Sequence, residues 1–233
     1  MHYAKGALLC ALGLLAGATS AAAEPAQACP GAQWSLRESA PGVDRSRLAQ
    51  ALDAAMADGR VTRAIVVVYD GAIVAERYAP GYGPDSVFFS YSMAKSFTAT
   101  LAGILVSQGR LALHAAAPVP EWSAADDPRR SITLAHLLNM SSGIATNESA
   151  DQLTSDVAAM LFGAGRHDVA HYAANHPLKF APGSYFAYSN SSSNVISGII
   201  RRSVGDDEAS YRRFIDEALF RPLGMASAVA SFD

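Results

Sequence analysis

The chain has 233 residues, of which 50% are hydrophobic and 17% are charged, and its formal net charge is −3. This size and composition predict one globular domain of ordinary size, or part of a larger one. The weakly acidic balance and the lack of a basic patch argue against a nucleic-acid partner.

The N-terminus has the pattern of an export signal. Lys5 precedes an apolar run over residues 6–17, and the small residues Ala21, Ala22 and Ala23 then offer a cleavage site. The apolar run is shorter than the roughly 20 residues that a membrane-spanning helix needs. We therefore expect residues 1–23 to be a signal peptide, with a periplasmic or secreted mature protein and no stable membrane insertion after cleavage.

The next predicted elements are a helix and a β-hairpin. Residues 24–43 have no periodicity and predict a lead-in segment before an ordered region at residues 44–233. Asp44 or Ser46 can cap a first helix that ends near Gly59. Its apolar positions recur every four residues, at Leu48, Leu52 and Met56.

The predicted hairpin consists of two β-branched runs, residues 64–69 and 72–78, joined by Asp70-Gly71. This dipeptide suits a tight two-residue turn. The first run is apolar at every position, which predicts a strand covered on both faces.

Residues 86–97 place Ser92 and Lys95 three residues apart where an apolar helix begins. If the helix starts at Ser92, both side chains lie on one face, one turn apart. A serine becomes a good nucleophile when a neighbouring base takes its proton, and a neutral lysine can do this. Lysine is rare here, since the chain has only Lys5, Lys95 and Lys179. The pattern alone is equally compatible with a solvent-facing lysine in the first helical turn.

The helix that follows Ser92 has one apolar stripe and ends near Gly109. A nucleophile at its N-terminus would have unpaired N–H groups and the helix dipole beside it, which favour the oxyanion of an acyl-transfer intermediate. Residues 132–140 predict a short buried helix, whereas residues 144–165 have weak periodicity.

A second candidate site consists of His167, Asp168 and His171. Histidines four apart on a helix can share a zinc ion, and metal-dependent hydrolases use that spacing with an acid between them. The acid here is shorter than the glutamate of such helices, and no long helix precedes the pair. A solvated helix face is therefore the favoured interpretation, and a zinc hydrolase built on His167 and His171 is kept as an alternative.

A last polar motif, Tyr188-Ser189-Asn190, follows a turn at residues 181–184. A tyrosine presented from a loop can relay a proton between a serine, a lysine and a leaving group, and Asn190 can hold a substrate carbonyl or amide. The alternative is a purely structural role, in which the tripeptide forms a polar turn with a packed tyrosine.

These motifs, in this order and separation, resemble the serine β-lactamase-like family. That family includes class C β-lactamases, D-alanyl-D-alanine carboxypeptidases, β-lactamase-fold esterases and 6-aminohexanoate-dimer hydrolases. The resemblance covers residues 61–233 and rests on Asp70-Gly71, Ser92-Met-Ala-Lys95, the stretch 132–143, Pro182-Gly183, Tyr188-Ser-Asn190 and the stretch 219–225. It implies an α/β (α+β) fold of the β-lactamase/transpeptidase type, an antiparallel sheet with a helical lobe.

The resemblance also implies an acyl-enzyme mechanism without a metal or organic cofactor. Ser92 would attack an ester, amide or lactam carbonyl, Lys95 and Tyr188 would shuttle the proton, and Asn190 would bind the substrate. The stretch 89–98 looks more like the esterase and aminohexanoate-oligomer branch than like dedicated β-lactamases. The alternatives are a penicillin-binding sensor that is acylated without turnover, or an inactive truncated homologue.

The family's third motif, a basic residue or histidine before x-Gly on a sheet strand, is not found after Asn190. The residues after Asn190 predict two helices. We therefore expect the C-terminal sheet strands to be missing from this chain, which leaves an unpaired strand edge, poor solubility and little activity of residues 24–233 alone.

Overall fold

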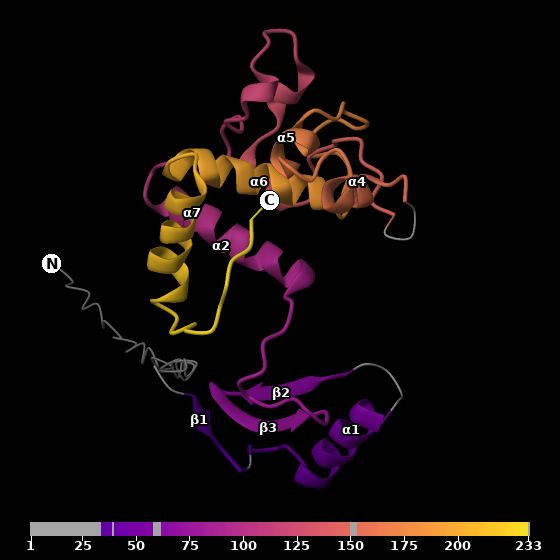
Figure 1. Ribbon diagram of the computed structural model, residues 1–233, viewed down its shortest axis with the longest axis vertical. Coiled ribbons are helices and arrows are strands. Elements are labelled where there is room, and N and C mark those ends of the chain that lie inside the picture. Colours follow the sequence, from indigo (N-terminus) through magenta and orange to yellow (C-terminus); the bar gives the residue numbers. More distant parts are fainter. Residues whose placement is uncertain (1–33, 39, 58–61, 150–152, 233) are drawn as a thin grey trace, which may run out of the picture. The chain divides into compact units, whose positions relative to one another are not determined.

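A computed structural model describes residues 34–38, 40–57, 62–149 and 153–232. They form two compact units, divided between Pro84 and Asp85 (Figure 1). The expected signal peptide, residues 1–23, lies outside the described residues. Among the helices of the described ranges, none is long and apolar enough to cross a membrane.

The first unit contains a three-stranded mixed sheet in the order β1-β3-β2. Strands β2 (Ala64–Tyr69) and β3 (Ala72–Tyr78) form the predicted antiparallel hairpin, with Tyr69 paired to Ala72. Asp70 and Gly71 have φ values of 46° and 69°. Positive φ at both central residues is the geometry of a type I′ turn, which matches the twist of the strands.

Strand β1 (Ser35–Leu36) corrects the prediction that residues 24–43 are only a lead-in. It pairs in parallel with β3, and the Arg37 N–H donates to the Ile73 carbonyl oxygen at 2.9 Å. A strand of two residues is too short to show a periodic pattern. It exists because the edge of β3 supplies hydrogen-bond partners, which are distant in the sequence.

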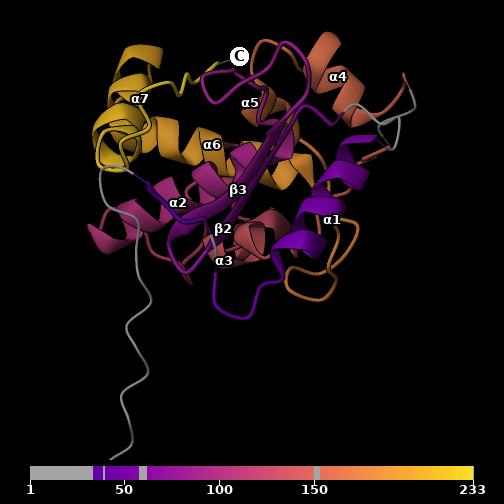
Figure 2. The same cartoon turned by 90° about the horizontal axis from the view of Figure 1, so that it is seen from below.

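Helix α1 (Arg45–Ala57) confirms the first predicted helix. Of its two candidate caps, Asp44 is the one used: its Oδ1 accepts hydrogen bonds from the N–H groups of Ser46 and Arg47 at 2.9 and 3.1 Å. Helix α1 lies alongside the hairpin in both views (Figure 1 and Figure 2). Its Leu52 is buried.

Within the first unit, described by itself, strand β2 is not covered on both faces. Val66 and Val68 are 48% and 47% exposed. Within the described ranges, β2 pairs only with β3, so its other edge has no partner strand. The apolar sequence favours burial, but burial requires neighbours that the first unit alone does not supply.

The second unit is helical, and in its described residues no sheet strand follows β3. Its longer helices are α2 (Ala94–Ser107) and α6 (Asn190–Val204). The predicted short helix is α3 (Leu134–Leu138), and the second predicted C-terminal helix is α7 (Glu208–Ile215), which continues as a π-helical turn, Asp216–Phe220. The unit also contains the short α-helices α4 (Asp156–Phe162), in the weakly periodic stretch, and α5 (Val169–Ala174), together with short 3₁₀ turns.

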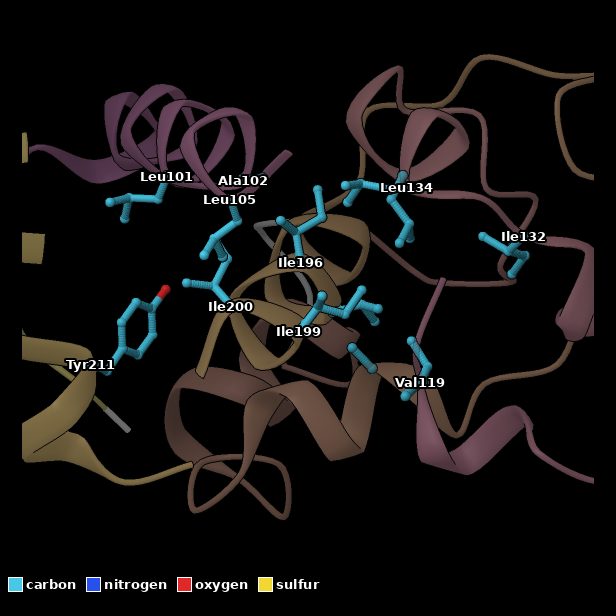
Figure 3. Close-up of a cluster of buried hydrophobic side chains, with 14 of the residues drawn as sticks. Leu101, Ala102, Leu105, Val119, Ile132, Leu134, Ile196, Ile199, Ile200 and Tyr211 are labelled. Carbon is cyan, nitrogen blue, oxygen red and sulfur yellow. The ribbon is translucent and has the colours of Figure 1, made fainter. Parts of the chain in front are cut away.

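Helix α6 is the centre of this unit's core. Ile196, Ile199 and Ile200 of α6 lie in one buried cluster with Leu101 and Leu105 of α2 (Figure 3). Helices α3, α5 and α7 also pack against α6. Burying an aliphatic side chain of this size stabilises a fold by about 1.5–3 kcal/mol. The packing therefore fixes the start of α6 relative to the start of α2. The candidate site lies between these two helix starts.

The segment before α6 is held by the motif at residues 132–143. The Ala187 N–H donates to the Met140 carbonyl oxygen at 2.9 Å, and the Lys179 N–H donates to the Gly143 carbonyl oxygen at 2.8 Å. Gly143 itself has a φ of 78°, a conformation that favours glycine. The motif thus supports the segment that ends at Tyr188.

Candidate active site

Ser92 lies in a short 3₁₀ turn, Tyr91–Met93, immediately before the first residue of α2. The predicted helix start was Ser92, so the α-helix begins two residues later than expected. Tyr91 has a φ of 45°, in the left-handed region that costs an ordinary L-residue about 1–2 kcal/mol. The strained residue, Tyr91, directly precedes Ser92, whose side chain is exposed. Strained backbone of this kind is concentrated at functional sites.

The Ser92 hydroxyl contacts two predicted site residues. Lys95 Nζ donates to Ser92 Oγ at 3.1 Å, and the Tyr188 hydroxyl donates to the same oxygen at 2.7 Å. Tyr188 is 96 residues away in the sequence. It reaches Ser92 because α2 and α6 pack together and Tyr188 directly precedes the Ser189 cap of α6.

Lys95 links all four residues that the sequence predicted. Besides Ser92, its Nζ donates to Asn190 Oδ1 at 2.6 Å, and it lies 5.0 Å from the centre of the Tyr188 ring. The Lys95 ammonium beside the phenol, together with the hydrogen bond to Ser92, lowers the pKa of Tyr188 from its usual value of 10.0. The Tyr188 phenolate is therefore more accessible near neutral pH than that of an isolated tyrosine.

Glu148 is the site residue that sequence reasoning missed. Asn190 Nδ2 donates to Glu148 Oε2 at 2.8 Å, on the opposite side of the amide from Lys95. Glu148 lies in the weakly periodic stretch after Gly143. A single acidic residue in such a stretch has no pattern that distinguishes it from a surface charge, so only the tertiary structure reveals its contact.

The zinc alternative requires His167 and His171 on one helix, and the structure does not place them so. His167 precedes α5, whereas His171 lies within it, and Asp168 caps the helix. His171 Nδ1 lies 2.8 Å from Glu121 Oε1 and its Nε2 lies 3.1 Å from Asn175 Nδ2. Among the described residues, no group of three or more His, Cys, Asp and Glu side chains is arranged to hold a metal ion.

Comparisons with known proteins define the class to which this fold belongs. A solved D-stereospecific amidohydrolase from Streptomyces sp. is 28% identical with a TM-score of 0.58, covering 77% of this chain and 54% of that one. A solved structure from Bacillus anthracis, described as a candidate 6-aminohexanoate-dimer hydrolase, is 26% identical with a TM-score of 0.55, covering 74% and 46%. The fold is thus that of the β-lactamase-like serine hydrolases.

The family model described as Beta-lactamase matches residues 48–230. The chain belongs to this family, as its motifs predicted. Among curated proteins, Esterase EstB of Burkholderia gladioli is 28% identical over 216 residues, covering 82% of this chain and 54% of that protein. The chain therefore spans about half the length of the relatives it matches.

Proposed function

We propose that the protein is a serine hydrolase that cleaves ester or amide bonds through an acyl-enzyme on Ser92. The observation that carries this proposal is the pair of hydrogen bonds from Lys95 Nζ and the Tyr188 hydroxyl to Ser92 Oγ, at 3.1 and 2.7 Å. A serine hydroxyl that contacts two titratable groups has an acceptor for its proton at the moment of attack. Family membership supports the same chemistry.

In the proposed mechanism, Ser92 Oγ forms a bond to the substrate carbonyl carbon as its proton moves to the Lys95–Tyr188 pair. The lowered pKa of Tyr188 favours a form in which Ser92 donates to the phenolate oxygen. The pair then returns the proton to the leaving alcohol or amine. The bond between the carbonyl carbon and that leaving group breaks in this step. Water then attacks the acyl carbonyl carbon as one of its protons moves to the Lys95–Tyr188 pair. The bond to Ser92 Oγ breaks and the pair returns the proton to Oγ, which releases the acid and regenerates Ser92.

The proposed substrate class is a small ester or amide, with lactams as a further class. Two observations favour it: one curated relative is called an esterase, and one solved relative is called an amidohydrolase. Both names belong to those proteins. The resemblance of the stretch 89–98 to the esterase and aminohexanoate-oligomer branch points in the same direction.

Kinetics with p-nitrophenyl esters test this function on the purified full chain. We expect a burst of nitrophenolate equivalent to the protein concentration, because Ser92, Lys95, Tyr188 and Asn190 are in contact. The turnover that follows should be slow, in keeping with the low activity predicted for residues 24–233 alone, and a chelator should leave it unchanged. A burst without turnover would instead identify a penicillin-binding sensor. Turnover that a chelator removes would support the zinc alternative at His167 and His171.

Tyr188→Phe is expected to slow acylation by about a hundredfold or more, because it removes a proton acceptor while keeping the ring. In the unmodified protein, the rate should rise with pH and reach half its maximum below pH 10, since loss of the Tyr188 proton creates a base and the pKa of Tyr188 is lowered from its usual value of 10.0. Stopped-flow measurement from pH 5 to 10 checks this. A rate and pH profile that are the same in both proteins would exclude Tyr188 from the proton transfer.

A further inference from the structure

The geometry points to Glu148 as a positioning residue that acts on Ser92 through Asn190 and Lys95. This inference rests on the proposed function, because the positioned group is the proposed proton shuttle. The chain of contacts is continuous: Glu148 Oε2 to Asn190 Nδ2 at 2.8 Å, Asn190 Oδ1 to Lys95 Nζ at 2.6 Å, and Lys95 Nζ to Ser92 Oγ at 3.1 Å.

The first step of the argument is the orientation of the Asn190 amide. Its two ends are chemically different, since the oxygen only accepts hydrogen bonds and the nitrogen only donates them. A carboxylate on one side and an ammonium on the other allow one orientation only, with Oδ1 toward Lys95. Without Glu148, the amide loses the acceptor that holds Nδ2, and a flipped amide would direct its N–H₂ group at the Lys95 ammonium.

The second step is the anchoring of Glu148 itself. The Thr146 hydroxyl donates to Glu148 Oε1 at 3.1 Å, and the N–H of Ser191, on the first turn of α6, lies 3.4 Å from the same oxygen. Both carboxylate oxygens therefore have donors, and one donor belongs to the helix that carries Asn190. Glu148 is half-buried, where hydrogen bonds to a charged group are stronger than in open water.

The third step is the loop that presents Glu148. The neighbouring Asn147 N–H donates to Asp156 Oδ2 at 2.6 Å, and the Asp156 N–H donates to the Asn147 carbonyl oxygen at 3.0 Å. Burial raises the pKa of Asp156, but the hydrogen bonds from Asn147, Tyr172 and His176 outweigh this effect and lower the pKa overall. Asp156 is therefore ionised at neutral pH and ties the loop to the start of α4.

The charge of Glu148 also has a consequence for Tyr188. A negative charge disfavours the phenolate, so Glu148 raises the pKa of Tyr188 and partly opposes the effect of Lys95. Removing that charge is expected to shift the pH dependence of Ser92 acylation to lower pH. A residue that only stabilises the fold would not produce this shift.

The test measures how fast a fluorophosphonate probe labels Ser92 in the full chain. Glu148→Ala is expected to slow labelling by about 10- to 100-fold, the usual scale for a lost supporting contact. Glu148→Gln, which keeps an acceptor oxygen but loses the charge, should lie between the alanine variant and the unmodified protein and should show the shift to lower pH. Glu217→Gln, an exposed carboxylate on the turn after α7, is the matched control and should change nothing.

A double-mutant cycle decides whether Glu148 acts through Asn190. In an Asn190→Ala background, Glu148→Ala should slow labelling by less than about twofold, since the group it positions is already gone. Equal slowing in both backgrounds would overturn the inference, and so would an unchanged rate and pH profile in Glu148→Ala.

A readout that needs no activity separates this inference from the proposed function. The side-chain N–H₂ signal of Asn190 is identified by its loss in Asn190→Ala, and its hydrogen exchange is followed by NMR. We expect faster exchange in Glu148→Ala and no change in Glu217→Gln. If Ser92 is not labelled in the unmodified protein, the proposed function fails, while unchanged exchange of this amide overturns the role of Glu148.

Discussion

Ser92→Ala is expected to abolish acylation and to reduce ester hydrolysis by about a thousandfold or more, the scale seen when a nucleophile is removed from a hydrolase. The physical reason is that Lys95 and Tyr188 both contact Ser92 Oγ, at 3.1 and 2.7 Å, and alanine leaves them with no oxygen to activate. The Ser92 side chain is exposed, so the free energy of unfolding should change by less than about 0.5 kcal/mol.

Ser96→Ala is the matched control for this change. Ser96 is also exposed and lies on α2, one turn beyond Ser92. Its substitution should leave both the rate and the stability unaltered. Hydrolysis that survives in Ser92→Ala at more than a tenth of the original rate would show that another group carries the reaction.

Gly143→Ala is expected to destabilise the helical unit by about 2–5 kcal/mol, from the left-handed backbone and a steric clash together. The φ of Gly143 is 78°, and an added Cβ would lie 2.2 Å from the Phe180 carbonyl oxygen. The clash involves backbone atoms of the segment that ends at Tyr188, so relief requires that segment to move. Urea unfolding measures the stability, and the labelling rate of Ser92 measures the displacement of Tyr188.

Gly103→Ala is the control for a glycine-to-alanine change in the same unit. Gly103 lies inside α2, and an added Cβ there would meet nothing within 4 Å. Alanine should stabilise α2 by about 0.5–1 kcal/mol, because glycine is the poorer helix former. Gly143→Ala with the stability of the unmodified protein would refute the role we assign to the motif at residues 132–143.

Several features were predictable because their sequence signals are local. Asp70-Gly71 specifies a turn that needs two positive φ values, and both residues have them. The α6 stripe of Ile196, Ile199 and Ile200 recurs at helical spacing, and all three are buried. The Ser92–Lys95 contact likewise follows from helical geometry over three residues.

Other features depend on contacts between distant segments. Strand β1 forms only against β3. Glu148 joins the candidate site only because α6 places Asn190 within hydrogen-bond distance of it. Val66 and Val68 show the opposite case, since their apolar pattern predicts burial but the first unit by itself does not supply the neighbours. Tyr188 was found through its motif, although its contact with Ser92 spans 96 residues.

The most direct test of the central claim is to identify the atom that becomes acylated. The full chain is treated with a fluorophosphonate or penicillin probe, digested, and mapped by peptide mass spectrometry. We predict one label for each protein molecule, on Ser92, with labelling lost in Ser92→Ala and kept in Ser96→Ala. A label on any other residue with Ser92 unmodified, or no label at all, would contradict the assignment of Ser92 as the nucleophile.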